Sequence, residues 1–179
     1  MTSATIIEQT KNWIRSVVIG CNFCPFAARV FNKDSIRFIV LETANTKTAL
    51  AALLDELQYL DDNETVETSF IIFPNHFKNF AAYLQLADRA DELIMDEDYE
   101  GVYQVASFHP DYCFADADNN DAANFTNRSI YPMLHILREE SIEKALEHFP
   151  DPDAIPERNV AFARQKGLAY MQLLRDACL

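Results

Sequence analysis

One stretch decides the predicted fold: Ser35-Ile36-Arg37-Phe38-Ile39-Val40-Leu41-Glu42. Its nearly continuous apolar run is what a β-strand covered on both faces requires, and such strands are typical of parallel sheets. Similar apolar runs occur twice more along the chain. We therefore predict three buried strands, over residues ~36–42, ~68–73 and ~102–108.

Segments with helical apolar spacing lie between these strands, over residues 46–60 and 77–95. Strands that alternate with helices favour parallel pairing through right-handed crossovers. We therefore predict an α/β fold with a small, mostly parallel three-stranded sheet. An N-terminal helix over residues 4–19, ended by a left-handed Gly20, and two C-terminal helices complete it. A two-layer α+β sandwich with one reversed strand is the alternative.

The composition limits both the architecture and the partners. A chain of 179 residues with 49% hydrophobic residues fits a single domain, residues 1–179. Its formal net charge of -13 argues against binding nucleic acid through phosphates or docking on an acidic membrane. No apolar run approaches the ~20 residues that span a bilayer, and no secretory signal precedes the first helix. We expect a cytoplasmic protein.

Glycine is scarce, which excludes two cofactor classes. The three glycines, Gly20, Gly101 and Gly167, are isolated from one another. Neither a G-x-G-x-x-G turn nor a P-loop can be written from them. We therefore expect no dinucleotide and no P-loop nucleotide as cofactor.

A long polar loop follows the third strand and begins with His109. Long loops in compact domains are usually functional or disordered, and the aromatic residues here argue against disorder. The pattern Asp116-x-Asp118-x-Asn120 begins like a calcium loop, but the glycine and glutamate that such a loop needs are missing. We predict that the loop carries a functional site.

The four cysteines are expected to be free thiols, ligands or core residues in a cytosolic protein. Cys21 and Cys24 have C-x-x-C spacing, but they follow a helix and precede a proline, unlike a thioredoxin-type pair. With His109 and Cys113 they could form a Cys₃His zinc site. The alternative is that Cys21, Cys113 and Cys178 are small buried apolar residues.

The segment after Pro132 is predicted to be a helix that runs to about Phe149, since proline suits a first helical turn. His135, Arg138 and Glu139 would then share one helix face. Arg128 would lie just before the amino end of this helix. Arg128, Arg138 and the helix terminus could together hold a carboxylate or phosphate. In the alternative, Arg138 and Glu139 form a solvated salt bridge and His135 has a structural role.

Four separated motifs carry a family resemblance: Asn22-Phe23-Cys24-Pro25-Phe26-Ala27, Phe108-His109-Pro110, Thr126-Asn127-Arg128-Ser129-x-Tyr131-Pro132-x-Leu134-His135-x-Leu137-Arg138-Glu139 and Ile155-Pro156-Glu157-Arg158-Asn159. In this order they resemble the bacterial and plant family catalogued as domain of unknown function number 1415, over nearly the whole chain. The resemblance implies no established activity. It implies a leucine at the place of Cys21 and no required cysteine at position 113. The motif positions that could carry chemistry are Cys24, His109, Arg128, His135 and Arg138.

Three hypotheses follow from these residues. In the first, the protein is an enzyme acting on a small anionic metabolite, with Cys24 as nucleophile and His109 or His135 as base. Substrate binding would fall to Asn22, Asn127, Arg128 and Arg138.

In the second hypothesis, Cys24, His109 and His135 bind a transition metal such as zinc. In the third, the protein is a non-enzymatic binding module. That hypothesis requires an exposed apolar patch from residues such as Tyr112, Phe125 and Tyr131.

Overall fold

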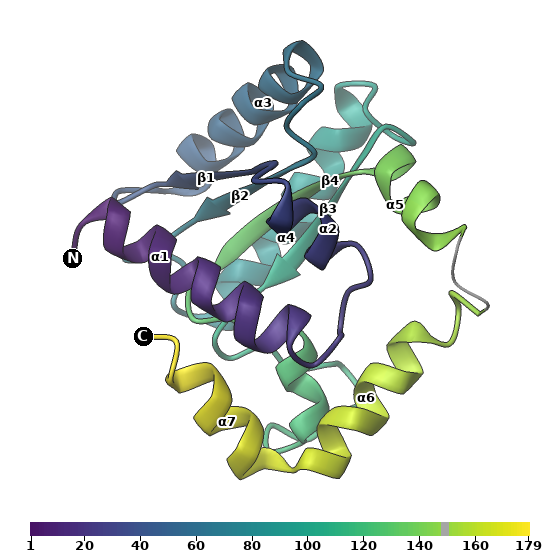
Figure 1. Ribbon diagram of the computed structural model, residues 1–179. Helices are drawn as coiled ribbons and strands as arrows, with labels where there is room; N and C mark the ends of the chain where they lie inside the picture. Colours follow the sequence, from purple (N-terminus) through teal and green to yellow (C-terminus); the bar gives the residue numbers. More distant parts are fainter. Residues whose placement is uncertain (148–150) are drawn as a thin grey trace.

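The fold is built around a four-stranded sheet with the order β1-β2-β4-β3 (Figure 1). The computed structural model describes residues 1–147 and 151–179. β1 (Ile36–Val40) pairs parallel with β2 (Thr68–Ile72), whereas β4 (Met133–Arg138) is antiparallel to both β2 and β3 (Tyr103–Phe108). The first three strands therefore share one direction, and the last strand runs against them.

The three predicted strands are confirmed to within two residues, but the predicted helix after Pro132 is wrong. Residues 133–138 form β4, and the helix α5 begins only at Glu139 and ends at Leu146. The predicted end near Phe149 lies outside the described residues. β4 lies between two strands with both faces covered, so its sequence lacks the polar alternation of a half-exposed strand. The sheet is therefore four-stranded and mixed within an α/β fold.

Helices α3 (Thr46–Asp62) and α4 (Phe80–Asp96) cover one face of the sheet. The side chains of Asn45 and Asn79 accept hydrogen bonds from the first turns of these helices, which fixes where each begins. Buried aliphatic and aromatic side chains of both helices pack on Ile71, Leu134 and Ile136 of the central strands. The two helices of this layer connect β1 to β2 and β2 to β3.

The opposite face is covered by the N-terminal segment (Figure 1). This segment comprises α1 (Ser3–Trp13), the π-helical turn η1 (Ile14–Ile19) and α2 (Ala27–Asn32). Beside it pack the 3₁₀ turn η2 (Ala122–Thr126), α6 (Ile155–Lys166) and α7 (Leu168–Asp176). Within residues 1–147 and 151–179, no helix has both the length and the apolar character needed to cross a membrane.

Gly20 ends the N-terminal helical segment for a reason other than the predicted one. Its φ of -60° is right-handed, and its N–H donates to the Arg15 carbonyl in the pattern of a π-helix. A β-carbon at this position would lie 2.2 Å from the backbone oxygen of Ser16. Glycine is therefore required by the close approach of the backbone and not by a left-handed conformation.

We expect Gly20→Ala to lower the free energy of unfolding by about 2 kcal/mol, because the added methyl group forces the π-helical turn to shift. Urea denaturation followed by circular dichroism measures this loss. Ser16→Ala is the matched control in the same turn and should change stability by less than about 0.5 kcal/mol. Equal midpoints for the two variants would contradict the steric explanation.

Candidate functional site

A cavity of about 170 Å³ lies between the sheet and the N-terminal segment. Trp13, Ile14 and Val18 close it from α1 and η1, while the loop before α2 contributes Cys24 and Phe26. π-Helical turns such as η1 occur frequently at functional sites. The described lining residues include no charged side chain, and the cavity is therefore an apolar space inside an acidic protein.

His135 lines this cavity from the centre of the sheet. Its Nε2 lies 2.7 Å from Oγ1 of Thr68, and that hydroxyl lies 2.6 Å from the Ile136 carbonyl oxygen. The hydroxyl has only one proton and donates it to the carbonyl, so it accepts from His135 Nε2–H. The ring is thus the Nε2–H tautomer, and its Nδ1 atom carries a free lone pair.

The Nδ1 atom of His135 has no hydrogen-bond partner among the described residues. Among the same residues, every side-chain nitrogen or oxygen that is completely covered has a hydrogen-bond partner. Because Nδ1 has no such partner, it must retain some accessible surface. His135 lines the cavity with carbon atoms, because no polar atom exposes surface to that space. His135 therefore has one hydrogen-bond acceptor that the described residues leave unused, and its ring lies beside the cavity.

Burial keeps His135 neutral. Its ring stacks on Phe70 with 3.8 Å between ring centroids, and Phe108 lies 6.0 Å away on a tilted plane. Removal from water disfavours the charged imidazolium and lowers the pKa of His135 to about 3. At neutral pH this side chain is an uncharged acceptor facing apolar surroundings.

Cys24 lines the same cavity as His135, so the structure brings together two of the three predicted catalytic residues. Burial raises the pKa of the Cys24 thiol, and the backbone N–H groups of Phe26 and Ala27 only partly oppose the shift. The sulfur is therefore a thiol at neutral pH, in contrast to the activated thiolate of a nucleophilic cysteine.

The loop that holds Cys24 is fixed by α6. Arg158 donates a hydrogen bond of 2.6 Å to the Asn22 carbonyl, and Asn159 donates one of the same length to the Phe23 carbonyl. Asn22 has a positive φ of 55° and an exposed side chain, so it shapes this turn with its backbone. Two motifs that are far apart in sequence thus meet to position one side chain.

His109 lies elsewhere and is fully engaged by the backbone. Its Nδ1 accepts from the Asp111 N–H at 2.9 Å, and its Nε2–H therefore donates to the Phe77 carbonyl, also at 2.9 Å. The ring is completely buried beside Phe80 and Tyr83 of α4, and this burial lowers its pKa. His109 is thus a neutral residue that ties the end of β3 to the segment before α4.

Arg128 and Asn127 hold the long loop together. Arg128 donates to the carbonyls of Tyr112 and Asn119, each at 2.8 Å. The Asn127 amide donates to the Ser107 carbonyl at 3.3 Å. These contacts use the polar groups that we expected to bind substrate.

Arg138 binds the carboxyl end of α3 and the turn that follows it. Its guanidinium donates to the carbonyls of Leu60, Asn63 and Val66 and to the hydroxyl of Tyr103. As a residue of β4 it does not share a helix face with His135 and Glu139, contrary to prediction. The predicted clamp of Arg128, Arg138 and a helix terminus is therefore not formed.

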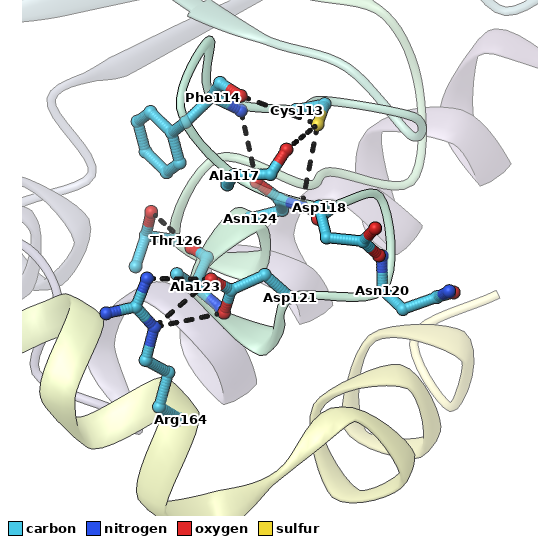
Figure 2. Close-up of polar contacts among 10 residues, drawn as sticks. All are labelled: Cys113, Phe114, Ala117, Asp118, Asn120, Asp121, Ala123, Asn124, Thr126 and Arg164. Carbon is cyan, nitrogen blue, oxygen red and sulfur yellow. Dashed lines mark hydrogen bonds and ion pairs between the residues drawn. The ribbon is translucent and has the colours of Figure 1, made fainter.

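Polar groups of the long loop bind one another and α6 (Figure 2). The Asn124 side chain accepts from the Phe114 N–H and donates to the Asp118 carbonyl. Asp121 binds Arg164 of α6 through both carboxylate oxygens, and this cation lowers the pKa of Asp121. The density of polar residues that predicted a site here is thus explained by the construction of the loop.

Two other predictions can be compared with the structure. Within residues 1–147 and 151–179, no group of three or more His, Cys, Asp or Glu side chains could hold a metal ion, so the metal hypothesis for Cys24, His109 and His135 is not supported. All four cysteines are free. Cys21 and Cys178 are buried as predicted in the apolar alternative, whereas Cys113 is half-buried.

The apolar patch required by the protein-binding hypothesis is not formed as predicted. Phe125 is 1% exposed and Tyr131 is 9% exposed, so both belong to the core. Tyr112 is half-buried against Phe80 and Phe114.

Comparison with known proteins places the chain in a family. The family model described as "Protein of unknown function (DUF1415)" matches residues 5–173. The chain belongs to this family. Searches of curated proteins and of solved structures gave no significant match.

For this member of the DUF1415 family, sequence reasoning missed several residues that form the cavity. The sequence assigned Thr68 only to a strand. Ala106 pairs with His135 across β3 and β4, and its small side chain leaves room for the cavity beside the imidazole ring. Their small size carries no signal in a single sequence. Arg158 and Asn159 did lie in a motif of the family resemblance, which was the one available indication of their role.

We expect Arg138→Met to lower the free energy of unfolding by about 2–4 kcal/mol, because several buried carbonyls lose their donor. Arg29→Met, which removes a partly exposed ion pair with Glu67, should cost less than about 1 kcal/mol. Urea denaturation at neutral pH measures both variants. A stable Arg138→Met protein would argue against the structural role of this side chain.

The pKa of His135 predicts a stability loss in acid. In the unfolded chain His135 binds a proton below about pH 6.5, whereas in the folded protein the ring stays neutral down to about pH 3. The free energy of unfolding is therefore at its full value above pH 6.5 and decreases as the pH falls from 6.5 towards 3. Between pH 7.5 and pH 4.5 the free energy of unfolding of the native protein should therefore decrease by about 2–3 kcal/mol more than that of the His135→Phe variant.

Urea denaturation of both proteins across this pH range gives the difference. His76→Phe controls for the removal of one histidine and should follow the native protein. Parallel curves for the native protein and His135→Phe would show that the ring is not held neutral.

Proposed function

We propose that this protein binds a small, neutral and largely apolar molecule in the cavity, through a hydrogen bond to His135 Nδ1. The apolar cavity carries this proposal, together with the unused Nδ1 acceptor of the adjoining His135, which a ligand reaches after a small turn of the ring. A ligand with one hydroxyl or N–H group satisfies that acceptor while its apolar part fills the remaining space. Apolar pockets with a few placed polar groups are the usual form of small-molecule sites.

The cavity favours a neutral ligand over the anionic metabolite that we expected from the sequence. An anion needs a cation or several donors when it leaves water. His135 is uncharged at neutral pH, and the guanidinium groups of Arg128 and Arg138 bind backbone carbonyls elsewhere. Nothing in the described lining compensates a negative charge.

The volume sets the size of the bound part of the ligand. An apolar cavity of about 150 Å³ accommodates benzene. The present cavity measures about 170 Å³, so six to eight heavy atoms, as a rough count, fit inside it. An aromatic ring with a hydroxymethyl group is of this size.

A thiol-dependent enzyme is the second candidate, because Cys24 and His135 line one cavity. At rest, however, burial holds the thiol protonated and the imidazole neutral. A nucleophilic cysteine needs the opposite arrangement, with a cation or an adjacent base lowering the pKa of the thiol. Ligand binding needs no group that lowers the pKa of the Cys24 thiol, and we therefore favour a binding function over an enzymatic one.

Three aromatic probes test the proposal: benzyl alcohol, toluene and benzoate. Trp13 is the single tryptophan of the chain and lines the cavity, so its fluorescence reports occupancy. We expect benzyl alcohol to bind about 2- to 12-fold more tightly than toluene, because the hydrogen bond contributes about 0.5–1.5 kcal/mol. Benzoate should not bind at pH 7.5.

Two variants make this experiment specific. His135→Phe should remove the preference for benzyl alcohol over toluene. Ala106→Leu should abolish binding of both by filling the space beside His135, whereas Val105→Leu, on the opposite face of β3, should not. Absence of benzyl alcohol binding to the folded protein would refute the proposal, and tighter binding of benzoate would favour an anionic ligand.

A further inference from the structure

A surface groove lies next to the cavity, between the loop before α2, helix α5 and the start of α6. α5 contributes Ile142, Ala145 and Leu146, and the start of α6 contributes Ile155 and Pro156. The described lining residues carry no charge, and Gln104 is the polar side chain among them. The groove measures about 280 Å³ and is more open than the cavity.

The groove and the cavity share three lining residues, namely Cys24, Phe26 and Leu137. Phe26 and Leu137 are buried in one small apolar cluster, against which Cys24, Ala106, Ile142 and Ala145 pack. The cluster therefore contains side chains of both spaces. The two spaces therefore adjoin each other at Cys24, Phe26 and Leu137.

The strand register shows how close the two spaces lie. Ala106 pairs with His135 in the cavity, and Gln104 pairs with Leu137, whose side chain reaches both spaces. These two rows of side chains are neighbours on the same face of β3 and β4. They are about 7 Å apart along the strands, which is the length of a few methylene groups.

We infer that the cavity and the groove form one binding path for an elongated amphiphile with a single neutral polar end, such as a medium-chain alcohol or primary amide. This inference rests on the proposed function, because it places the polar end at His135 Nδ1. The chain leaves the cavity past Cys24 and Leu137 and continues between α5 and the start of α6. A ligand confined to the cavity would leave the apolar side of α5 uncovered.

α5 supports this assignment through its burial. Ile142, Ala145 and Leu146 of this helix are only half-buried, and no described residue of α5 is fully buried. Amphipathic helices normally bury their apolar stripe against the core. An apolar chain in the groove would cover these side chains.

A series of straight-chain alcohols from 1-butanol to 1-decanol tests the inference on the intact protein. Each methylene removed from water contributes about 0.8 kcal/mol, so affinity should rise about fourfold per added carbon. In the native protein this rise should continue beyond 1-hexanol, which is about the size that the cavity alone accommodates. Trp13 fluorescence measures binding across the series.

Ala145→Phe narrows the groove and leaves Trp13 as the single tryptophan. We expect this variant to bind 1-butanol with the same affinity as the native protein. Its affinity should not increase further for alcohols longer than 1-hexanol. Glu143→Phe is the matched control, because Glu143 is an exposed residue of α5 outside the groove. It should reproduce the native series.

The outcomes separate the two proposals. If 1-butanol and benzyl alcohol do not bind, the proposed function fails and the path fails with it. If the short ligands bind but affinity levels off at 1-hexanol in the native protein, the path alone is overturned. It is also overturned if Ala145→Phe changes the oligomeric state in sedimentation and leaves the alcohol series unaltered, since the groove would then be a contact between copies of the chain.

Discussion

The hydroxyl of Thr68 ties the position of β4 to the chemistry of the cavity. By donating to the Ile136 carbonyl and accepting from His135, it joins β2 to the strand inserted between β2 and β3. Side chains alternate across a strand, so a shift of one residue in this pairing would turn His135 to the α3/α4 face. The sheet register and the free Nδ1 acceptor therefore depend on the same contact.

Much of the fold could be predicted from the sequence because its apolar runs are long and clearly separated. The α/β class and three strand positions followed from them, whereas Met133 to Arg138 did not, since an apolar run flanked by proline fits a helix or a buried strand equally well. The direction and the central position of β4 depend on pairing between distant segments. A local sequence pattern does not predict pairing between distant segments.

The candidate site was predicted only in part, and the errors have a common physical cause. Polar residues such as Arg128, Arg138 and Asn127 suggested ligand binding, but irregular backbone needs many hydrogen-bond partners and uses these side chains for that purpose. Cys24 and His135 were identified because of their chemistry. The cavity that both residues line lies beside small neighbours such as Ala106, and a single sequence does not show which residues become neighbours in the fold.

The cavity also has a mechanical consequence. Unfolding eliminates internal voids, and hydrostatic pressure favours the state of smaller volume. The cavity volume of about 170 Å³ corresponds to about 100 mL/mol, and the volume change of unfolding, about 20–100 mL/mol in size, scales with such volumes without equalling them. The protein is accordingly more compressible where the cavity lies, on the side of the sheet that faces η1, and a ligand in the cavity would lower the compressibility of that side.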